Sequence, residues 1–144
     1  MVYPFDAGLF LGVGVRFQWE NVEKRVIRYV AEGDDWNWKD YHKMARISSF
    51  AMHNLSHKVD VIFDLTQSVR LPGGAIAHLR SLGKPAGAPL TGRVIIIGLD
   101  ASIEERLLAG GSTRVLEFRD QKICFADNEE QAQSILGTFQ TAAQ

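Results

Sequence analysis

The sequence predicts a single α/β domain in which helices cover a mixed β-sheet. Apolar and polar residues alternate over residues 15–20, which is typical of a strand with one buried face. The apolar run at residues 59–65 is the candidate for a strand at the centre of the sheet, and the β-branched run at residues 94–97 has the composition of a strand that is buried on both faces. Between these runs, apolar residues recur every three or four positions, as they do along one face of a helix.

The first two strands are expected to form an antiparallel hairpin. The alternating strand is followed by the polar residues 21–24, which suit a turn, and then by a second strand-like run over residues 25–32. Both faces of this second run are partly apolar. Residues 1–14 are interpreted as an apolar leader or edge segment, so the domain itself is expected to cover residues 15–144.

Helices and strands then alternate. Asn37 is expected to cap a first helix that ends at about residues 53–55, and Asp40 adds negative charge to its first turn. After the strand at 59–65, Pro72 suits the first turn of a second helix over residues 73–82, because a missing N–H costs nothing there.

The last third of the chain continues this alternation. The strand at 94–97 precedes a third helix that opens with a capping box at Ser102, and a second capping box at Asp127 opens the fourth. Residues 122–126 form a short strand, whereas residues 114–118 fit either a helix or a strand. The predicted order is therefore β-β-α-β-α-β-α-β-α, with about four helices and parallel pairing after the hairpin.

The composition limits the classes of function. A chain of 144 residues with a formal net charge of -1 is one domain without the basic excess that nucleic-acid binding needs. Cys124 is its one cysteine, which fits a reducing compartment and a cytoplasmic location. The apolar run at residues 8–15 is too short for a membrane span and lacks the features of a signal peptide.

The central strand carries a family resemblance. The tripeptide Asp64-Leu65-Thr66 ends the run VDVIFDLT, and this motif and the order of elements over residues 15–139 resemble the STAS domain of anti-sigma-factor antagonists. The chain is more similar still to SpoIIAA-like proteins of uncertain function. In the antagonists, a serine shortly after this strand is phosphorylated. Here residues 72–75 read Pro-Gly-Gly-Ala, so the resemblance implies a regulatory module but not a phosphorylation switch.

A first candidate site lies between the central strand and the second helix. Amides at a helix start attract anions, and glycines let a ligand approach the backbone. If a ligand binds there, the chain is a carrier of a small anionic or amphipathic molecule. The alternative is that the proline and glycines only shape the turn. The residues assigned to this hypothetical ligand site are Asp64, Thr66, Ser68, Arg70, Gly73 and Gly74.

Catalysis and metal binding have weaker patterns. Asp64 and Asp100 follow neighbouring strands and could serve a hydrolase or lyase as an acid–base pair, but no nucleophile–base pair is visible. His53 and His57 are four residues apart, and a metal site needs further ligands. We therefore assign no catalytic residue, metal or cofactor and expect a protein that is not an enzyme.

The remaining histidines and the tryptophans bear on interactions. His42 and His78 have no evident partner in the sequence and are expected on helix surfaces. Trp19, Trp36 and Trp38 are candidate interface residues, because aromatic side chains often anchor interfaces; the alternative is that they cover the core near the ends of their elements. With the apolar leader, they favour a homodimer. The sequence thus predicts a non-enzymatic regulatory or protein-interaction module that contacts another protein or itself.

Overall fold

The structure is a computed structural model, and it describes residues 14–52, 55–81, 91–109, 114–118 and 121–142. Residues 1–13 of the predicted leader lie outside these residues, as does His53.

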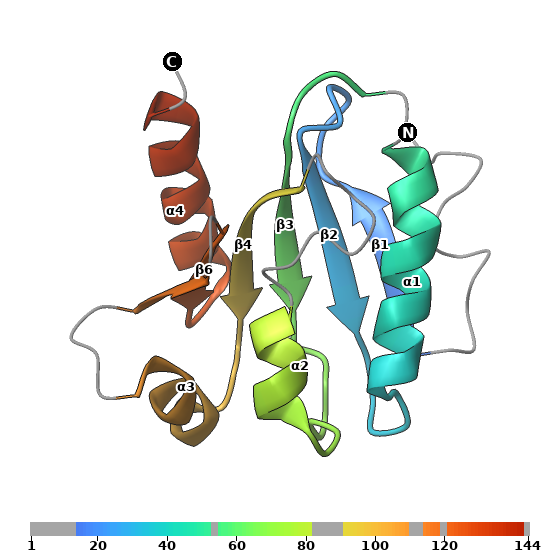
Figure 1. The fold of residues 1–144 in the computed structure, drawn as a ribbon, viewed down its shortest axis with the longest axis vertical. Coiled ribbons are helices and arrows are strands. Elements are labelled where there is room, and N and C mark those ends of the chain that lie inside the picture. Colours follow the sequence, from blue (N-terminus) through green and yellow to red (C-terminus); the bar gives the residue numbers. More distant parts are fainter. Residues whose placement is uncertain (1–13, 53–54, 82–90, 110–113, 119–120, 143–144) are drawn as a thin grey trace.

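Ten helices and strands follow one another in the described residues (Figure 1). The alternative left open for residues 114–118 is decided in favour of a strand, so the order gains one strand before the last. The elements are β1 Val15–Trp19, β2 Val26–Ala31, α1 Trp38–Ala51, β3 Val59–Asp64, α2 Ala75–Ser81, β4 Thr91–Ile97, α3 Ala101–Leu108, β5 Val115–Phe118, β6 Gln121–Ala126 and α4 Glu129–Ala142.

The strands form one mixed sheet in the order β1-β2-β3-β4-β6-β5. The predicted hairpin of β1 and β2 is antiparallel, as is the pair of β5 and β6, and all other neighbours are parallel. β3 and β4 lie side by side, with Ile62 opposite Ile95 and Phe63 opposite Ile96. The predicted α/β fold with a mixed sheet and an N-terminal hairpin is therefore confirmed.

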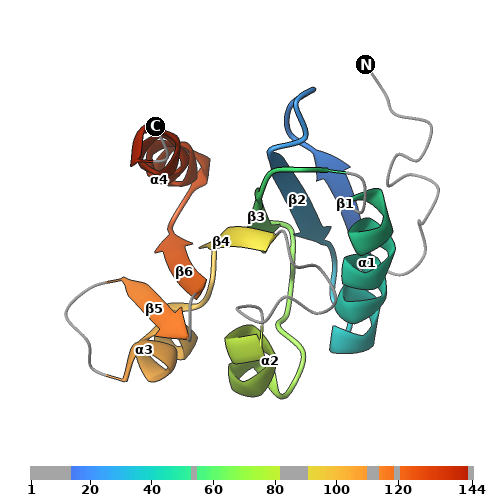
Figure 2. The same cartoon turned by 45° about the horizontal axis from the view of Figure 1, so that its top comes forward.

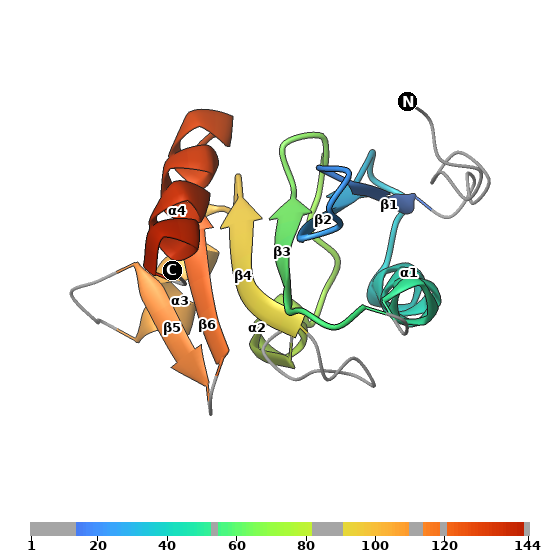
Figure 3. The ribbon, with the colours of Figure 1, turned by 90° about the horizontal axis from the view of Figure 1, so that it is seen from above.

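Helices cover the two faces of the sheet unequally. Seen from above, α4 lies on one face, and α1 and α2 lie on the other (Figure 3). On the face of α1 and α2, here called the first face, Met44, Leu79 and Leu107 from α1, α2 and α3 join the core around Phe63. On the second face, Ala132 and Leu136 of α4 join the aliphatic residues of β3, β4 and β6.

The second face is only partly covered by helix. α4 packs on β4 and β6, and it lies at the opposite end of the sheet from α1 (Figure 2). On this face β1 carries polar side chains, because Arg16 and Gln18 alternate with its buried residues. On β2, Val26 joins the apolar cluster under α4, and Arg28 bonds to Glu129 at the start of α4. The part of the second face over β1 and β2 holds the buried Arg28, which is described first below.

The first two helix starts show how local hydrogen bonds decide element boundaries. Asn37 caps α1 as predicted, and Asp40 returns the bond by accepting from the Asn37 amide, which completes a capping box. α2 begins at Ala75, so the prediction that Pro72 lies in its first turn is wrong. Gly74 has a φ of 81°, which is incompatible with a right-handed helix.

The last two helix caps are displaced from the predicted residues. Asp100, not Ser102, caps α3 by accepting from the Ser102 amide. Asn128 accepts from the amide of Gln131 at the start of α4, and the Gln131 side chain accepts from the amide of Asp127. Several cap-forming residue types stand next to one another at both places, and the periodic pattern does not choose between them.

Two glycines test the backbone geometry. Gly137 lies in α4, where an added Cβ would meet no side chain within 4 Å, so Gly137→Ala should stabilise the protein by about 0.5–1 kcal/mol through helix propensity. Gly98 has a φ of 79°, which residues with side chains rarely adopt, and a Cβ there would meet Thr66 at 3.3 Å. For both reasons, Gly98→Ala should destabilise the protein by about 1 kcal/mol or more. Urea unfolding followed by tryptophan fluorescence measures both, and equal effects would contradict this account.

Candidate functional site

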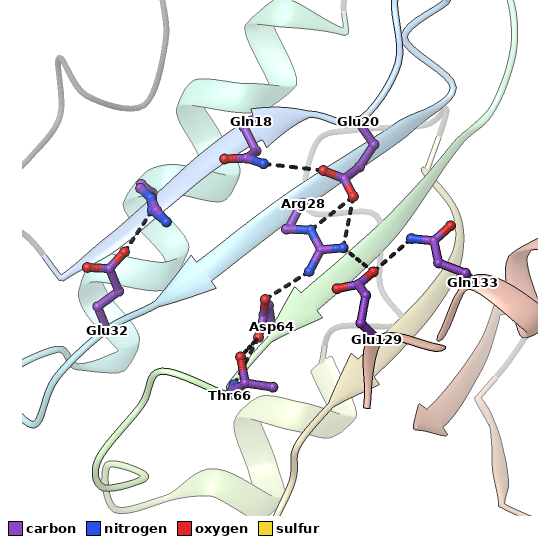
Figure 4. Close-up of polar contacts among 9 residues, drawn as sticks. Gln18, Glu20, Arg28, Glu32, Asp64, Thr66, Glu129 and Gln133 are labelled. Carbon is purple, nitrogen blue, oxygen red and sulfur yellow. Dashed lines mark hydrogen bonds and ion pairs between the residues drawn. The ribbon is translucent and has the colours of Figure 1, made fainter. Parts of the chain in front are cut away.

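A buried arginine on the second face gathers three carboxylates. Arg28 lies in the middle of β2 and is 7% exposed. Its Nε and Nη2 donate to Glu20 at 3.0 and 2.8 Å, its Nη1 donates to Asp64 at 2.8 Å, and its Nη2 also donates to Glu129 at 2.6 Å (Figure 4). We call these four residues the Arg28 cluster. It joins side chains that are 8, 36 and 101 residues from Arg28.

The topology of the sheet brings the four residues together. Glu20 follows β1, and Asp64 is the last residue of β3, so the two strands beside β2 each supply one carboxylate. Glu129 is the first residue of α4, whose start reaches Arg28 from the covered half of the second face. The cluster therefore ties the N-terminal hairpin, the central strand and the last helix to one side chain.

The contacts within the cluster favour the charged forms of Arg28 and Glu129. Burial acts to lower the pKa of Arg28, but hydrogen bonds to Glu129 and Glu20 outweigh it, and the net shift is upward. The hydrogen bond from Arg28 is the main reason that the pKa of Glu129 is lowered. Three carboxylates share one guanidinium, so removing Arg28 would leave three acidic groups without their common partner.

Asp64 connects this cluster to the loop after β3. Its Oδ2 accepts from Arg28, while its Oδ1 accepts from the Thr66 amide at 2.9 Å and the Thr66 hydroxyl at 2.6 Å. The same turn recurs after β4, where Asp100 Oδ1 accepts from the amide and hydroxyl of Ser102 at 2.8 and 2.6 Å. These are Asx-type turns that close the ends of two adjacent strands.

The two turns remove the acid–base pair considered from the sequence. Both Asp64 and Asp100 are engaged in hydrogen bonds within the chain. The hydrogen bonds from Ser102 also lower the pKa of Asp100, which keeps it deprotonated at neutral pH and unsuited to act as a general acid. The hydrolase or lyase hypothesis therefore receives no support from the site.

A pocket of about 500 Å³ lies beside these turns, between the loop after β3 and the start of α3. We call it the carboxyl-edge pocket. Its polar side chains include Ser68, whose hydroxyl accepts from Trp36 Nε1 at 2.8 Å and donates to the Arg70 carbonyl at 3.2 Å. The aliphatic residues that line it are Leu65, Val69, Leu71, Leu99 and Ile103.

The six residues of the predicted ligand site do not come together. Ser68 and Arg70 line the carboxyl-edge pocket, whereas Asp64 and Thr66 are bonded to each other. Gly73 and Gly74 precede α2 and are not part of the pocket lining. α2 has only seven residues, so its start offers little of the dipole that the ligand hypothesis used.

The three tryptophans are core residues in the folded chain. Trp19, Trp36 and Trp38 are 7, 2 and 5% exposed. Trp36 donates to Ser68 and Trp38 donates to the Pro72 carbonyl at 3.2 Å, so both hold the loop after β3 against the first face. Little of their surface is therefore left for a partner, and the interface role expected for these side chains stays a prediction.

The histidines also differ from the expectation. His57 Nε2 lies 3.0 Å from the Lys24 carbonyl, and no group of three metal-ligating side chains occurs among the described residues. His42 and His78, expected to have no partner, face each other with Nε2 and Nδ1 at 3.0 Å. Their separation of 36 residues leaves no periodic signal in the sequence. Arg28, in contrast, could have been found from the sequence, because a charged residue in a strand with two apolar faces needs partners.

Comparisons with known proteins support the fold. No protein-family model and no curated protein matches the chain. A search of solved structures finds the crystal structure of an uncharacterized protein of the DUF3478 family, with a SpoIIAA-like fold, from Shewanella loihica PV-4. The two chains are 20% identical, and the match covers 85% of this chain and 94% of that one with a TM-score of 0.57.

This likeness confirms the expected architecture. The chain has a SpoIIAA-like, STAS-like fold with a six-stranded mixed sheet, an N-terminal antiparallel hairpin and four helices in its described residues. Within those residues, none of the helices has the length and apolar character that crossing a membrane requires.

The Arg28 cluster predicts a large difference between two arginines on the same face. Arg28→Ala leaves three carboxylates without their partner and should cost about 3–5 kcal/mol of unfolding free energy. Arg16 pairs with Glu32, whose side chain is 45% exposed, so Arg16→Ala should cost less than about 1 kcal/mol. Urea unfolding measures both, and similar costs for the two variants would contradict a structural role for the cluster.

The lowered pKa of Glu129 predicts a pH dependence. Its contribution to stability is present above the ordinary glutamate pKa of about 4.3 and is lost as the pH falls through the lower pKa of the folded state. As the pH falls below about 4.5, the melting temperature of Glu129→Gln should therefore decrease less than that of the wild type. Glu130→Gln, which changes the next residue of the same helix turn, is the control and should follow the wild type.

Proposed function

We propose that this chain is a non-enzymatic regulatory or protein-interaction module that is not switched by phosphorylation. The carboxyl-edge pocket is its binding surface. The observation that carries this proposal is Val69, which is 76% exposed and lines the pocket together with four other aliphatic residues. An exposed aliphatic side chain beside a hollow with both aliphatic and polar walls fits a protein partner.

The polar groups of the pocket argue for binding over chemistry. The hydroxyl of Ser68 is bonded to Trp36 and Arg70, and the Asp100 carboxylate is bonded to Ser102. A catalytic site needs a nucleophile or a base that is positioned toward a substrate. These side chains are instead engaged within the chain itself, and the aliphatic residues remain to make contacts.

The absence of a phosphorylation switch rests on the loop before α2. Residues 72–75 contain no hydroxyl where the antagonists carry their serine. The nearby hydroxyl of Thr66 donates to Asp64, and a phosphate there would lie beside that carboxylate. Phosphate found by mass spectrometry on residues 66–74 of the protein purified from its own cells would contradict this part of the proposal.

The partner is expected to insert an aliphatic or aromatic side chain into the pocket. Arg70 lines the pocket and adds a positive charge that a partner carboxylate would complement. A second copy of the chain is one such partner, and the homodimer expected from the sequence remains part of the proposal. We place the protein in the cytoplasm, where its single buried Cys124 stays reduced.

Two valines provide a matched test. Val22 lies in the β1–β2 turn and is 77% exposed, so Val22→Asp controls for the charge introduced by Val69→Asp. A photo-reactive residue at position 69 should crosslink to one protein, or to a second copy of this chain, that the same residue at position 22 does not capture. With the purified pair, Val69→Asp should weaken binding about tenfold or more, and Val22→Asp should leave it unchanged.

The outcomes of this test separate the proposal from its alternatives. Equal effects of the two aspartates on affinity would contradict the pocket as the binding surface. Light scattering at micromolar concentration distinguishes a homodimer, in which only Val69→Asp shifts the mass toward the monomer, from binding to another protein. Circular dichroism of both variants shows that the fold is kept.

A further inference from the structure

The paired histidines join two helices of the first face. His42 projects from α1 and His78 from α2, and their Nε2 and Nδ1 atoms are 3.0 Å apart. The ring centroids are 5.2 Å apart. That separation is close to the largest that a 3.0 Å contact between two imidazoles allows, so the two nitrogens face each other head on. The arrangement is a nearly linear imidazole–imidazole hydrogen bond.

Aromatic side chains hold both rings in place. The His78 ring stacks on Trp38 with centroids 5.0 Å apart and an interplanar angle of 8°. The His42 ring meets Tyr41 edge to face at 5.5 Å. Trp38 also donates to the Pro72 carbonyl, so the same tryptophan supports His78 and the loop that leads into α2. Neither ring can turn away from the other without losing an aromatic contact.

A bond between two imidazoles depends on their protonation. It needs one N–H donor and one nitrogen lone pair, so it forms when both rings are neutral or when one of them is protonated. When both rings are protonated, two N–H groups and two positive charges face each other, and the bond is replaced by repulsion. The pair therefore tolerates one proton beyond the neutral state of its two rings, but not two.

The surroundings of His42 oppose the second proton. Burial lowers its pKa, and the positive charges of His78 on α2 and Arg46 on α1 lower it further. The bond is therefore kept above the ordinary histidine pKa, and it is lost as the pH falls through the lower pKa of the folded state. Tyr41, which packs on the same ring, stays neutral throughout this range because burial raises its pKa.

We propose that the His42–His78 pair is a proton-sensitive junction that holds α2 against α1 at neutral pH and loosens α2 in mild acid. The change is local. Residues 67–69 are bonded to Gly33 at the end of β2, and Ser68 is bonded to Trp36, so this part of the loop keeps its place. Leu79 is fully buried in the core and limits how far α2 moves.

The junction has a consequence for the carboxyl-edge pocket, and this consequence rests on the proposed function. Leu71 lines the pocket from the segment that leads into α2, whereas Val69 is bonded to Gly33. Loosening of α2 in mild acid should therefore disturb the Leu71 wall of the binding surface and leave its exposed valine in position. Partner binding through the pocket would weaken as the pH falls.

Hydrogen exchange of the α2 amides tests the junction without a partner. After correction for the intrinsic pH dependence of exchange, wild-type α2 should exchange about tenfold faster at about pH 5 than at about pH 7.5, while α3 and α4 change little. His42→Gln keeps an amide for hydrogen bonding but cannot titrate, so it should abolish the pH dependence. His57→Gln removes a histidine at the Lys24 carbonyl and should behave like the wild type.

Each outcome decides the proposal. Wild-type protection of α2 that does not change with pH, or a change of equal size in His42→Gln, overturns the junction. If His42→Gln does not fold, His78→Asn and a direct NMR titration of the His42 ring replace it, and a His42 pKa at or above the ordinary value overturns the junction. Pocket binding is measured separately at both pH values, so failure of the proposed function leaves the exchange result intact.

Discussion

Arg28 places a positive charge in the middle of a strand whose six residues are all buried. Such a charge is stable only when carboxylates approach it from the elements around it. Glu20, Asp64 and Glu129 do so from the hairpin, the central strand and the last helix. The second face of the sheet is thereby divided, with apolar packing under α4 and ionic bonding beside it. Arg28 in this way joins the start of α4 to the end of β3, and Asp64 extends the connection to the loop after β3.

Most of the fold was open to prediction because its signals are local. The alternation in β1 and the aliphatic runs of β3 and β4 depend on neighbouring residues, and the structure confirms them. Helix starts were less predictable. Asp100 and Ser102 both have the chemistry of a cap, and the structure uses one as the cap and the other as its hydrogen-bond donor. The seven-residue α2 depends on a left-handed glycine that no pattern distinguishes.

The site was harder to predict because its contacts are distant in sequence. Asp64 was singled out as a site residue, but its partner Arg28 was treated as one residue of a strand with an uncertain inward side. His42 and His78 are joined by the packing of two helices, and nothing in either segment indicates the other. Trp36 had two interpretations, an interface residue or a cover of the core near a helix start, and it is buried. Local chemistry identified the residue types, and tertiary packing determined what they contact.

The Arg28 cluster also limits how this sequence can drift. Replacing Glu20 alone weakens one corner of a network, whereas replacing Arg28 leaves three acids facing one another. Substitutions at these four positions are therefore not independent, and an apolar residue at position 28 becomes acceptable only after the acids around it have changed. The four residues of the Arg28 cluster are therefore expected to change together, whereas the aliphatic residues under α4 can be replaced by one another singly.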